Sequence, residues 1–166
     1  MIVKNLLTVI SATVALLLLC GPAWAGTTTT TFAVSATVIN NCTVSATPLA
    51  YGNYDPTSAS NTTGTNTITV TCTDADAYTI ALNGGTTSGG TISQRKMTNG
   101  ASNTLNYNIY QDSGHITLWG DGTTGTTENG TGSGAAQNYT AYGEITHAQT
   151  APAGSYTDTI TTTISF

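Results

Sequence analysis

Apolar and polar residues alternate with a period of two over several stretches of the chain, which is the pattern of half-buried β-strands. Between residues 67 and 73 every second residue is apolar, and threonine fills the positions between. The same alternation occurs at 78–82, 105–109 and 156–166. Threonine is β-branched, so it favours strands without adding charge. Residues that favour helix interiors are scarce after residue 25, and the sequence therefore predicts an all-β chain.

Stretches rich in Gly, Asn, Asp and Ser separate the predicted strands, at residues 55–64, 84–90 and 120–134. The last of these is a low-complexity Gly/Thr segment, and we expect it to be a mobile loop inside the domain. No shift in composition and no internal repeat indicates a second domain. Short strands joined by such turns predict an antiparallel β-sandwich.

Residues 27–39 form the most regular alternating run of the chain. Its even positions carry Thr28, Thr30, Phe32, Val34, Ala36 and Val38. Successive residues of a strand point to opposite faces, so the larger apolar side chains share one face. Because chain termini usually fray unless they pair into a sheet, we expect this segment to dock, either on its own domain or on another copy.

The C-terminal run places Ile160, Ile164 and Phe166 on its inward face. Since the run ends on an inward apolar position, we expect the sandwich to present an open edge there. An open edge is a template for the addition of a further strand.

Residues 1–25 are typical of a secretory signal peptide that is cleaved from the mature chain. Lys4 supplies the positive start, residues 6–19 the apolar run, and Ala23 and Ala25 the small residues before the cleavage site. The apolar run is shorter than the roughly 20 residues that a bilayer span needs. Lipid attachment at Cys20 is a rival interpretation that Leu19 disfavours, so we expect no membrane anchor.

Cleavage leaves two cysteines, Cys42 and Cys72, in an exported chain. An even pair of this kind predicts a disulfide. A metal site would need more ligands at suitable spacing than two cysteines and two distant histidines provide.

Charge and composition exclude several functions. Charged residues make up 7% of the chain, against about 25% in average domains, and there are 38 threonines. Three Lys and Arg residues are too few for nucleic-acid binding, which needs clustered positive charge. His115, His147, Ser155 and Asp158 carry the groups of a hydrolytic triad, but no nucleophile-elbow motif accompanies them. We expect surface or packing roles for these residues, and no enzyme.

Two binding functions remain as alternatives. Asp74, Asp76, Asp112 and Asp121 offer oxygen ligands for Ca²⁺, but they lack EF-hand spacing, and aspartates in turns usually accept bonds from their own backbone. Trp119 and nearby tyrosines offer a platform for sugars, although a sandwich tryptophan is more often a core residue. We therefore expect no cofactor and no metal.

An ordered set of short motifs gives the mature chain a family resemblance. The motifs are Cys-Thr-Val at 42–44, Leu-Ala-Tyr-Gly-Asn-Tyr-Asp-Pro at 49–56, Ile-Thr-Val-Thr-Cys-Thr at 68–73, Leu-Asn-Tyr-Asn-Ile-Tyr at 105–110, Trp-Gly-Asp-Gly at 119–122, Tyr-Gly-Glu-Ile at 142–145 and Gly-Ser-Tyr-Thr-Asp-Thr at 154–159. In this order, the sequence resembles the spore coat protein U family, which includes subunits of archaic (Csu-type) chaperone–usher pili. Glu144 departs from the family pattern, which has a basic or neutral residue there.

The resemblance implies an immunoglobulin-like sandwich over residues 41–166 that lacks its last strand, preceded by a donor-strand extension at 26–40. It implies three kinds of partner: a periplasmic chaperone that lends a strand, an outer-membrane usher, and other copies or related subunits whose extensions replace that strand. The donor residues would be Thr30, Phe32, Val34, Ala36 and Val38, and the acceptor edge Ile160, Ile164 and Phe166.

Three functions follow as hypotheses. The favoured one is a structural subunit of an extracellular pilus, built by donor-strand complementation and used in adhesion and biofilm formation. The second is a secreted or spore-coat β-sandwich whose residues 27–39 pair within their own domain. The third is a carbohydrate-binding module that uses Trp119.

Overall fold

A computed structural model describes residues 24–166, so the predicted signal peptide lies almost entirely outside the described residues. The chain divides after Thr37 into two units, which are described separately. Residues 24–37 of the first unit contain neither helix nor strand, and all their side chains are exposed. Residues 38–166 form the second unit, here called the domain.

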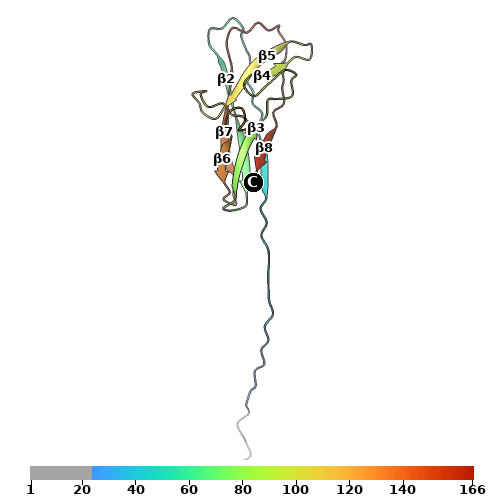
Figure 1. The fold of residues 1–166 in the computed structure, drawn as a ribbon, viewed down its shortest axis with the longest axis vertical. Coiled ribbons are helices and arrows are strands. Elements are labelled where there is room, and N and C mark those ends of the chain that lie inside the picture. The colour runs from blue at the N-terminus through green and yellow to red at the C-terminus, as the bar shows by residue number, and fades with distance from the viewer. Residues whose placement is uncertain (1–23) are drawn as a thin grey trace, which may run out of the picture. The chain divides into compact units, whose positions relative to one another are not determined.

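The domain is built from eight strands (Figure 1). In chain order they are β1 (Cys42–Ala46), β2 (Thr62–Cys72), β3 (Ala77–Leu82), β4 (Arg95–Thr98), β5 (Thr104–Tyr110), β6 (Glu128–Thr131), β7 (Gln137–Ile145) and β8 (Thr162–Ser165). One sheet has the order β1-β2-β7-β5-β4 and the other the order β6-β3-β8, with every strand pair antiparallel. The predicted all-β sandwich is confirmed.

Within residues 24–166 there is no helix, and therefore none that could cross a bilayer.

The core consists of the alternate residues that the strands turn inward. Its buried members are Ile68, Val70, Cys72, Tyr78, Ile80, Leu82, Met97, Leu105, Tyr107, Ile109, Trp119, Ala141 and Ile145. The period-two prediction for 67–73, 78–82 and 105–109 is thus confirmed, because each predicted inward residue lies in this core. A large apolar side chain buried in this way contributes about 1.5–3 kcal/mol to folding.

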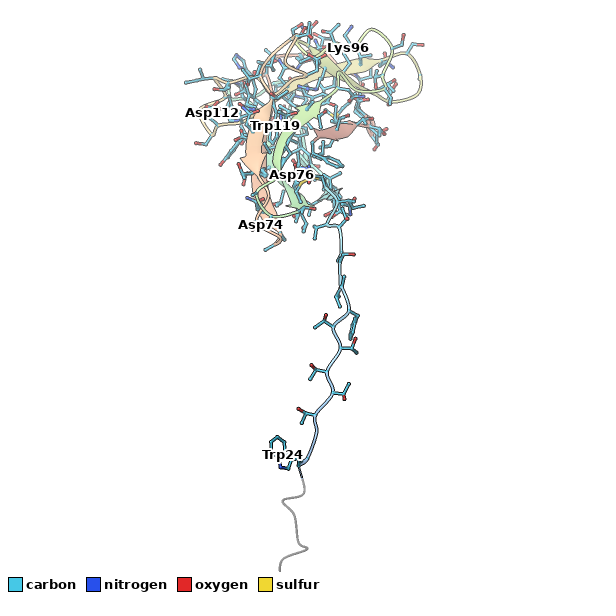
Figure 2. The ribbon with its side chains drawn as sticks, turned by 60° about the horizontal axis from the view of Figure 1, so that its bottom comes forward. Trp24, Asp74, Asp76, Lys96, Asp112 and Trp119 are labelled. Carbon is cyan, nitrogen blue, oxygen red and sulfur yellow. A yellow bond between two sulfur atoms is a disulfide. The ribbon has the colours of Figure 1, made fainter. Side chains whose placement is uncertain are left out.

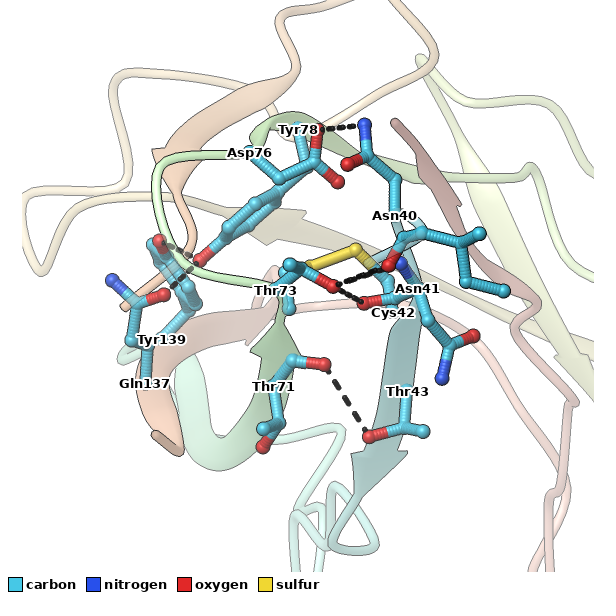
Figure 3. The surroundings of a disulfide bond; sticks show 12 residues. Asn40, Asn41, Cys42, Thr43, Thr71, Thr73, Asp76, Tyr78, Gln137 and Tyr139 are labelled. Carbon is cyan, nitrogen blue, oxygen red and sulfur yellow. Dashed lines mark hydrogen bonds between the residues drawn. A yellow bond between two sulfur atoms is a disulfide. The ribbon is translucent and has the colours of Figure 1, made fainter. Parts of the chain in front are cut away.

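The predicted disulfide is present and joins the two residues that face each other at one end of β1 and β2, Cys42 and Cys72. A polar cluster continues beside it (Figure 3). The Thr73 hydroxyl accepts a hydrogen bond from the backbone N–H of Asn41 at 3.0 Å, and the Asn40 amide donates to an Asp76 carboxylate oxygen at 2.8 Å. The residues just before β1 are therefore fixed to the loop that follows β2.

Two segments differ from the expectation. Residues 128–131 of the expected mobile loop form β6, which pairs with β3. A Cβ on Gly130 would lie 2.4 Å from both Tyr78 Cζ and Tyr139 Oη, so the glycine is what lets β6 approach these rings. In the C-terminal run only Thr162–Ser165 pairs as a strand, although the inward alternation extends back to Tyr156.

Reduction of the disulfide is expected to destabilise the domain by about 3–4 kcal/mol, because the bridge closes a loop with a sequence separation of 30 residues. Urea unfolding of the oxidised protein and of a Cys42→Ser, Cys72→Ser double variant measures the difference. Equal unfolding midpoints in the two proteins would contradict the prediction.

Candidate functional site

One side of the sandwich is open between β1 and β8. In the described part of the chain β1 pairs only with β2, and β8 pairs only with β3, so each strand leaves one edge without a partner. The two strands lie next to each other, at the end of the domain that holds the C-terminus (Figure 1). Two free edges therefore face each other across the boundary between the sheets.

Apolar side chains along this opening lack cover. Val44 of β1 is paired with Val70 of β2, and cross-strand partners point to the same face. Val70 is fully buried, whereas Val44 is 42% exposed. On the other wall Ile160 and Ile164 are partly buried, and Phe166 is 56% exposed. The predicted acceptor residues thus line an edge that the domain's own strands do not cover.

The opening contains a groove of about 450 Å³, with an apolar floor that includes Ile68, Leu82 and Ile109. A second cavity of about 650 Å³ adjoins it, and four residues line both cavities. These shared residues are Leu49, Tyr51, Met97 and Tyr156. The two cavities together form one continuous site, here called the groove.

Two glycines make room for residues 49–51, which line the groove. Gly64 of β2 and Gly143 of β7 are paired across the sheet. A Cβ on Gly64 would lie 2.9 Å from the Ala50 carbonyl oxygen, and one on Gly143 would lie 2.3 Å from the Tyr51 hydroxyl oxygen. The chain around residues 49–51 therefore crosses the sheet where side chains are absent, which brings Tyr51 into the groove.

An ionised carboxylate lies in the groove wall. Asp158 accepts a hydrogen bond from the Tyr107 hydroxyl at 2.7 Å and others from the backbone N–H groups of Thr86 and Thr87 at 2.9 and 3.0 Å. Burial acts to raise the pKa of Asp158, but hydrogen bonds from Tyr107, Thr159, Thr86 and Thr87 outweigh it and hold the pKa below its usual value. Burial, with the hydrogen bond to Asp158, raises the pKa of Tyr107.

Arg95 is a fully buried cation close to the same place. Its guanidinium donates to the carbonyl oxygens of Asn83 at 2.9 Å and Trp119 at 2.8 Å. Burial lowers the pKa of Arg95, and the neighbouring Tyr107, Tyr51 and Asp158 oppose that effect. A buried charge is costly unless it is hydrogen-bonded or paired, so carbonyl oxygens and the nearby Asp158 together stabilise this guanidinium.

The predicted donor residues lie apart from regular structure. Thr30, Phe32, Val34, Ala36 and Val38 are all exposed and belong to no strand. Phe32 and Val34 are each 85% exposed and Val38 is 84% exposed. Large apolar side chains in such a row are candidates for contact with a partner.

The structure does not assemble the hydrolytic triad that the sequence offered. Asp158 is bound to Tyr107, Thr86 and Thr87 instead of a histidine. His147 contacts Asn61, with 2.7 Å between Nδ1 and Oδ1, and His115 lies 3.8 Å from the Glu144 carboxylate.

The calcium and sugar alternatives find no support either. Residues 24–166 contain no cluster of three or more His, Cys, Asp or Glu side chains that could hold a metal ion. Asp112 and Asp121 accept bonds from backbone N–H groups of their own loops, and Figure 2 shows Asp112 on a different part of the domain from Asp74 and Asp76. The sugar platform is wrong, because Trp119 is 1% exposed and its indole N–H donates to the Ile80 carbonyl.

Sequence reasoning did not find the groove residues Leu49 and Tyr51, nor Val44 and Arg95, which lie outside the groove lining. One signal was present for Asp158, since a carboxylate on the inward face of an otherwise apolar run must have an internal partner. No comparable signal marks Val44, because its exposure depends on which strands pair with β1, and in the described residues only β2 does.

Comparisons with known proteins agree with the fold. The family model described as Spore Coat Protein U domain matches residues 28–163. Protein U of Myxococcus xanthus is 31% identical over 159 residues, which covers 87% of this chain and 88% of that protein.

A solved structure also matches the fold. It is the crystal structure of the CsuC–CsuE chaperone–tip adhesion subunit pre-assembly complex from archaic chaperone–usher Csu pili of Acinetobacter baumannii. One chain of that structure aligns with a TM-score of 0.56 and 24% identity. The alignment covers 78% of this chain and 40% of the solved one, so this chain spans about two fifths of its length.

The lowered pKa of Asp158 predicts that its contribution to the free energy of unfolding is lost in acid. A carboxyl with a depressed folded-state pKa stabilises the fold above its ordinary pKa of about 4 and loses that contribution as the pH falls through the folded-state value. At pH 7 we expect an Asp158→Asn variant to unfold at lower urea concentration than the wild type, with a difference between their midpoints that narrows as the pH falls below about 4. A difference that stays constant as the pH falls would contradict the assignment.

Proposed function

The chain belongs to the Spore Coat Protein U domain family, and from that membership we propose that it is a structural subunit of an extracellular pilus assembled by strand donation. The observation that carries the proposal is the opening between β1 and β8: its groove is lined by Ala46 of β1 and Thr162 of β8, and inward-facing Val44 of β1 remains 42% exposed. A groove with an apolar floor and two unpaired strand edges fits one more β-strand. It has no catalytic or metal-binding group arrangement that would favour an enzyme.

Residues 27–39 of another copy are the proposed occupant. Their even positions present Phe32, Val34, Ala36 and Val38 on one face. Burial of each large side chain contributes about 1.5–3 kcal/mol, with less from alanine, and the two strand edges add main-chain hydrogen bonds.

The direction of the donated strand follows from the position of the donor segment. The donor segment is joined to the domain at the end where β1 begins. β8 runs toward that same end, because it is antiparallel to β3 and lies next to β1. A donor antiparallel to β8 would leave the neighbour's groove at the opposite end. Each contact would then be head-to-tail, which extends into a fibre and does not close.

Such an assembly explains the predicted leader and partners. On this proposal the leader directs export, a periplasmic chaperone covers the groove before assembly, an outer-membrane usher passes subunits outward, and the fibre serves adhesion and biofilm formation at the cell surface. The solved relative is described as a chaperone–subunit complex from chaperone–usher pili, which supports the chaperone as a partner.

A second candidate is a coat protein in which residues 27–39 fill the groove of their own domain. The family description and the 31% identity to Protein U favour it. The two candidates differ in the state of the purified chain, because a self-filled groove gives a stable monomer and a donated strand gives polymers.

A Val34→Asp substitution is expected to abolish polymerisation, since it places an unpaired carboxylate in an apolar groove. The matched control is Ser35→Asp, which adds the same charge on the opposite face of the donor segment. Electron microscopy and size-exclusion chromatography of the exported protein measure polymer formation. We expect polymers from the wild type and from Ser35→Asp, and none from Val34→Asp.

Deletion of residues 27–38 tests the same proposal from the other side. The truncated domain is expected to bind a donor but to enter no fibre. Normal fibres from the truncated chain, or equal loss from both aspartate variants, would overturn strand donation.

A further inference from the structure

The wall of the groove opposite β1 is held by a side chain and not by a strand ladder. Thr157 exchanges two backbone hydrogen bonds with Thr98, at 2.9 and 3.0 Å. Thr161 donates its backbone N–H to the Asn83 side chain at 2.9 Å and accepts from the Asn83 backbone. Between these points the described part of the chain gives residues 158–160 no backbone–backbone hydrogen bond. The backbone of Thr159 instead bonds to the Asp158 carboxylate, so this stretch pairs with no other strand.

Asp158 is the group that fixes this stretch. Its Oδ1 atom accepts four hydrogen bonds, from the backbone N–H groups of Thr86 and Thr87 and from their hydroxyls at 3.2 and 3.0 Å. Its Oδ2 atom accepts the Tyr107 hydroxyl at 2.7 Å. Hydrogen bonds to an ionised acceptor are about twice as strong as neutral ones. A single carboxylate therefore joins the groove wall to both a loop and the groove floor.

The loop between β3 and β4 is bound from both sides by opposite charges. The Arg95 guanidinium donates to two carbonyl oxygens of this loop, that of Asn83 and, at 3.5 Å, that of Ile92. The Asp158 carboxylate accepts from backbone N–H groups of the same loop. Gly85 has a φ of +89°, and a Cβ there would lie 2.0 Å from Asp158 Oδ2. The loop can therefore close around the carboxylate only with glycine at this position. A loop held so firmly is a rigid support for the wall.

We propose that Asp158, held by Tyr107, Thr86 and Thr87, is a positioning residue for strand capture: it keeps residues 158–160 out of any strand ladder, with Ile160 in the lining of the groove, so that this stretch remains available to an incoming strand. This inference rests on the proposed function and deepens it, because it names what shapes the acceptor wall. The captured partner is the donor segment of a second copy of this chain.

The test uses the full chain carrying Val34→Asp, which is expected to form no polymer and leaves a groove of wild-type sequence open, so that it serves as the wild type here. The probe is a fluorescent synthetic peptide of residues 27–39, with anisotropy as the measure of binding and dissociation. Tyr107→Phe removes one hydroxyl from the carboxylate and leaves the ring in the groove floor. Its matched control is Tyr139→Phe, which removes the hydroxyl that lies 2.7 Å from Tyr78 Oη and is not among the groove residues. Asp158→Asn has its control in Asp121→Asn, a carboxylate that binds backbone N–H groups of its own loop.

We expect about tenfold weaker peptide binding and faster peptide dissociation in Tyr107→Phe and Asp158→Asn, and less than a twofold change in both controls. Hydrogen exchange of the amides of residues 158–160 provides a readout that a loss of global stability alone would not move. In the two groove variants these amides should lose the protection that bound peptide confers on them in the wild type.

The possible outcomes distinguish a failure of strand donation from a failure of the positioning role of Asp158. If the wild type fails to bind the peptide, or binds a Val34→Asp peptide equally well, strand donation itself is wrong. If the wild type binds and discriminates, but Tyr107→Phe and Asp158→Asn bind and dissociate like their controls, the positioning role of Asp158 is overturned and strand donation stands.

Discussion

The gap between β1 and β8 combines two deficits, one of apolar cover and one of main-chain hydrogen bonds. Val44 on one wall and Phe166 on the other are inward-pattern residues that stay exposed, and both strands have a free edge. A sandwich can leave apolar residues uncovered only if something else covers them or if the protein tolerates aggregation. The domain's geometry, its exposed donor segment and its family membership all become consistent if the missing cover is a strand.

Alternation along the chain predicted the core residues of β2, β3 and β5, because a strand with one buried face repeats every two residues, but not the buried Met97, Trp119, Ala141 and Ile145. It predicted the all-β class and the inward set from Ile68 to Cys72, and the even pair of cysteines predicted the disulfide. It did not predict β6, because glycine and threonine in a low-complexity segment carry no apolar period. It also did not predict that residues 156–161 leave the ladder, since that depends on the hydrogen bonds of Asp158 with a loop some 70 residues away in sequence.

The few charged side chains of this protein have different structural roles. Three acidic side chains, Asp55, Asp112 and Asp121, lie in turns and accept backbone N–H groups there. Arg95 and Asp158 are the exception, because they lie at the inside of the fold and bind opposite polar groups of one loop. With only 7% charged residues the sheet surfaces are mostly hydroxyl and amide, so electrostatics shapes the groove wall more than the exterior.

The position of the disulfide has a mechanical consequence for any fibre of such subunits. Tension on a fibre would enter each domain through the residues just before β1, which is an edge strand with five ladder pairs. The bond at Cys42 transfers that load at once to Cys72 on β2, whose other edge pairs with β7 along nine residues. In such a fibre the pulling force would bypass the ladder between β1 and β2, and unzipping of β1 from the sheet would not limit the strength of the fibre.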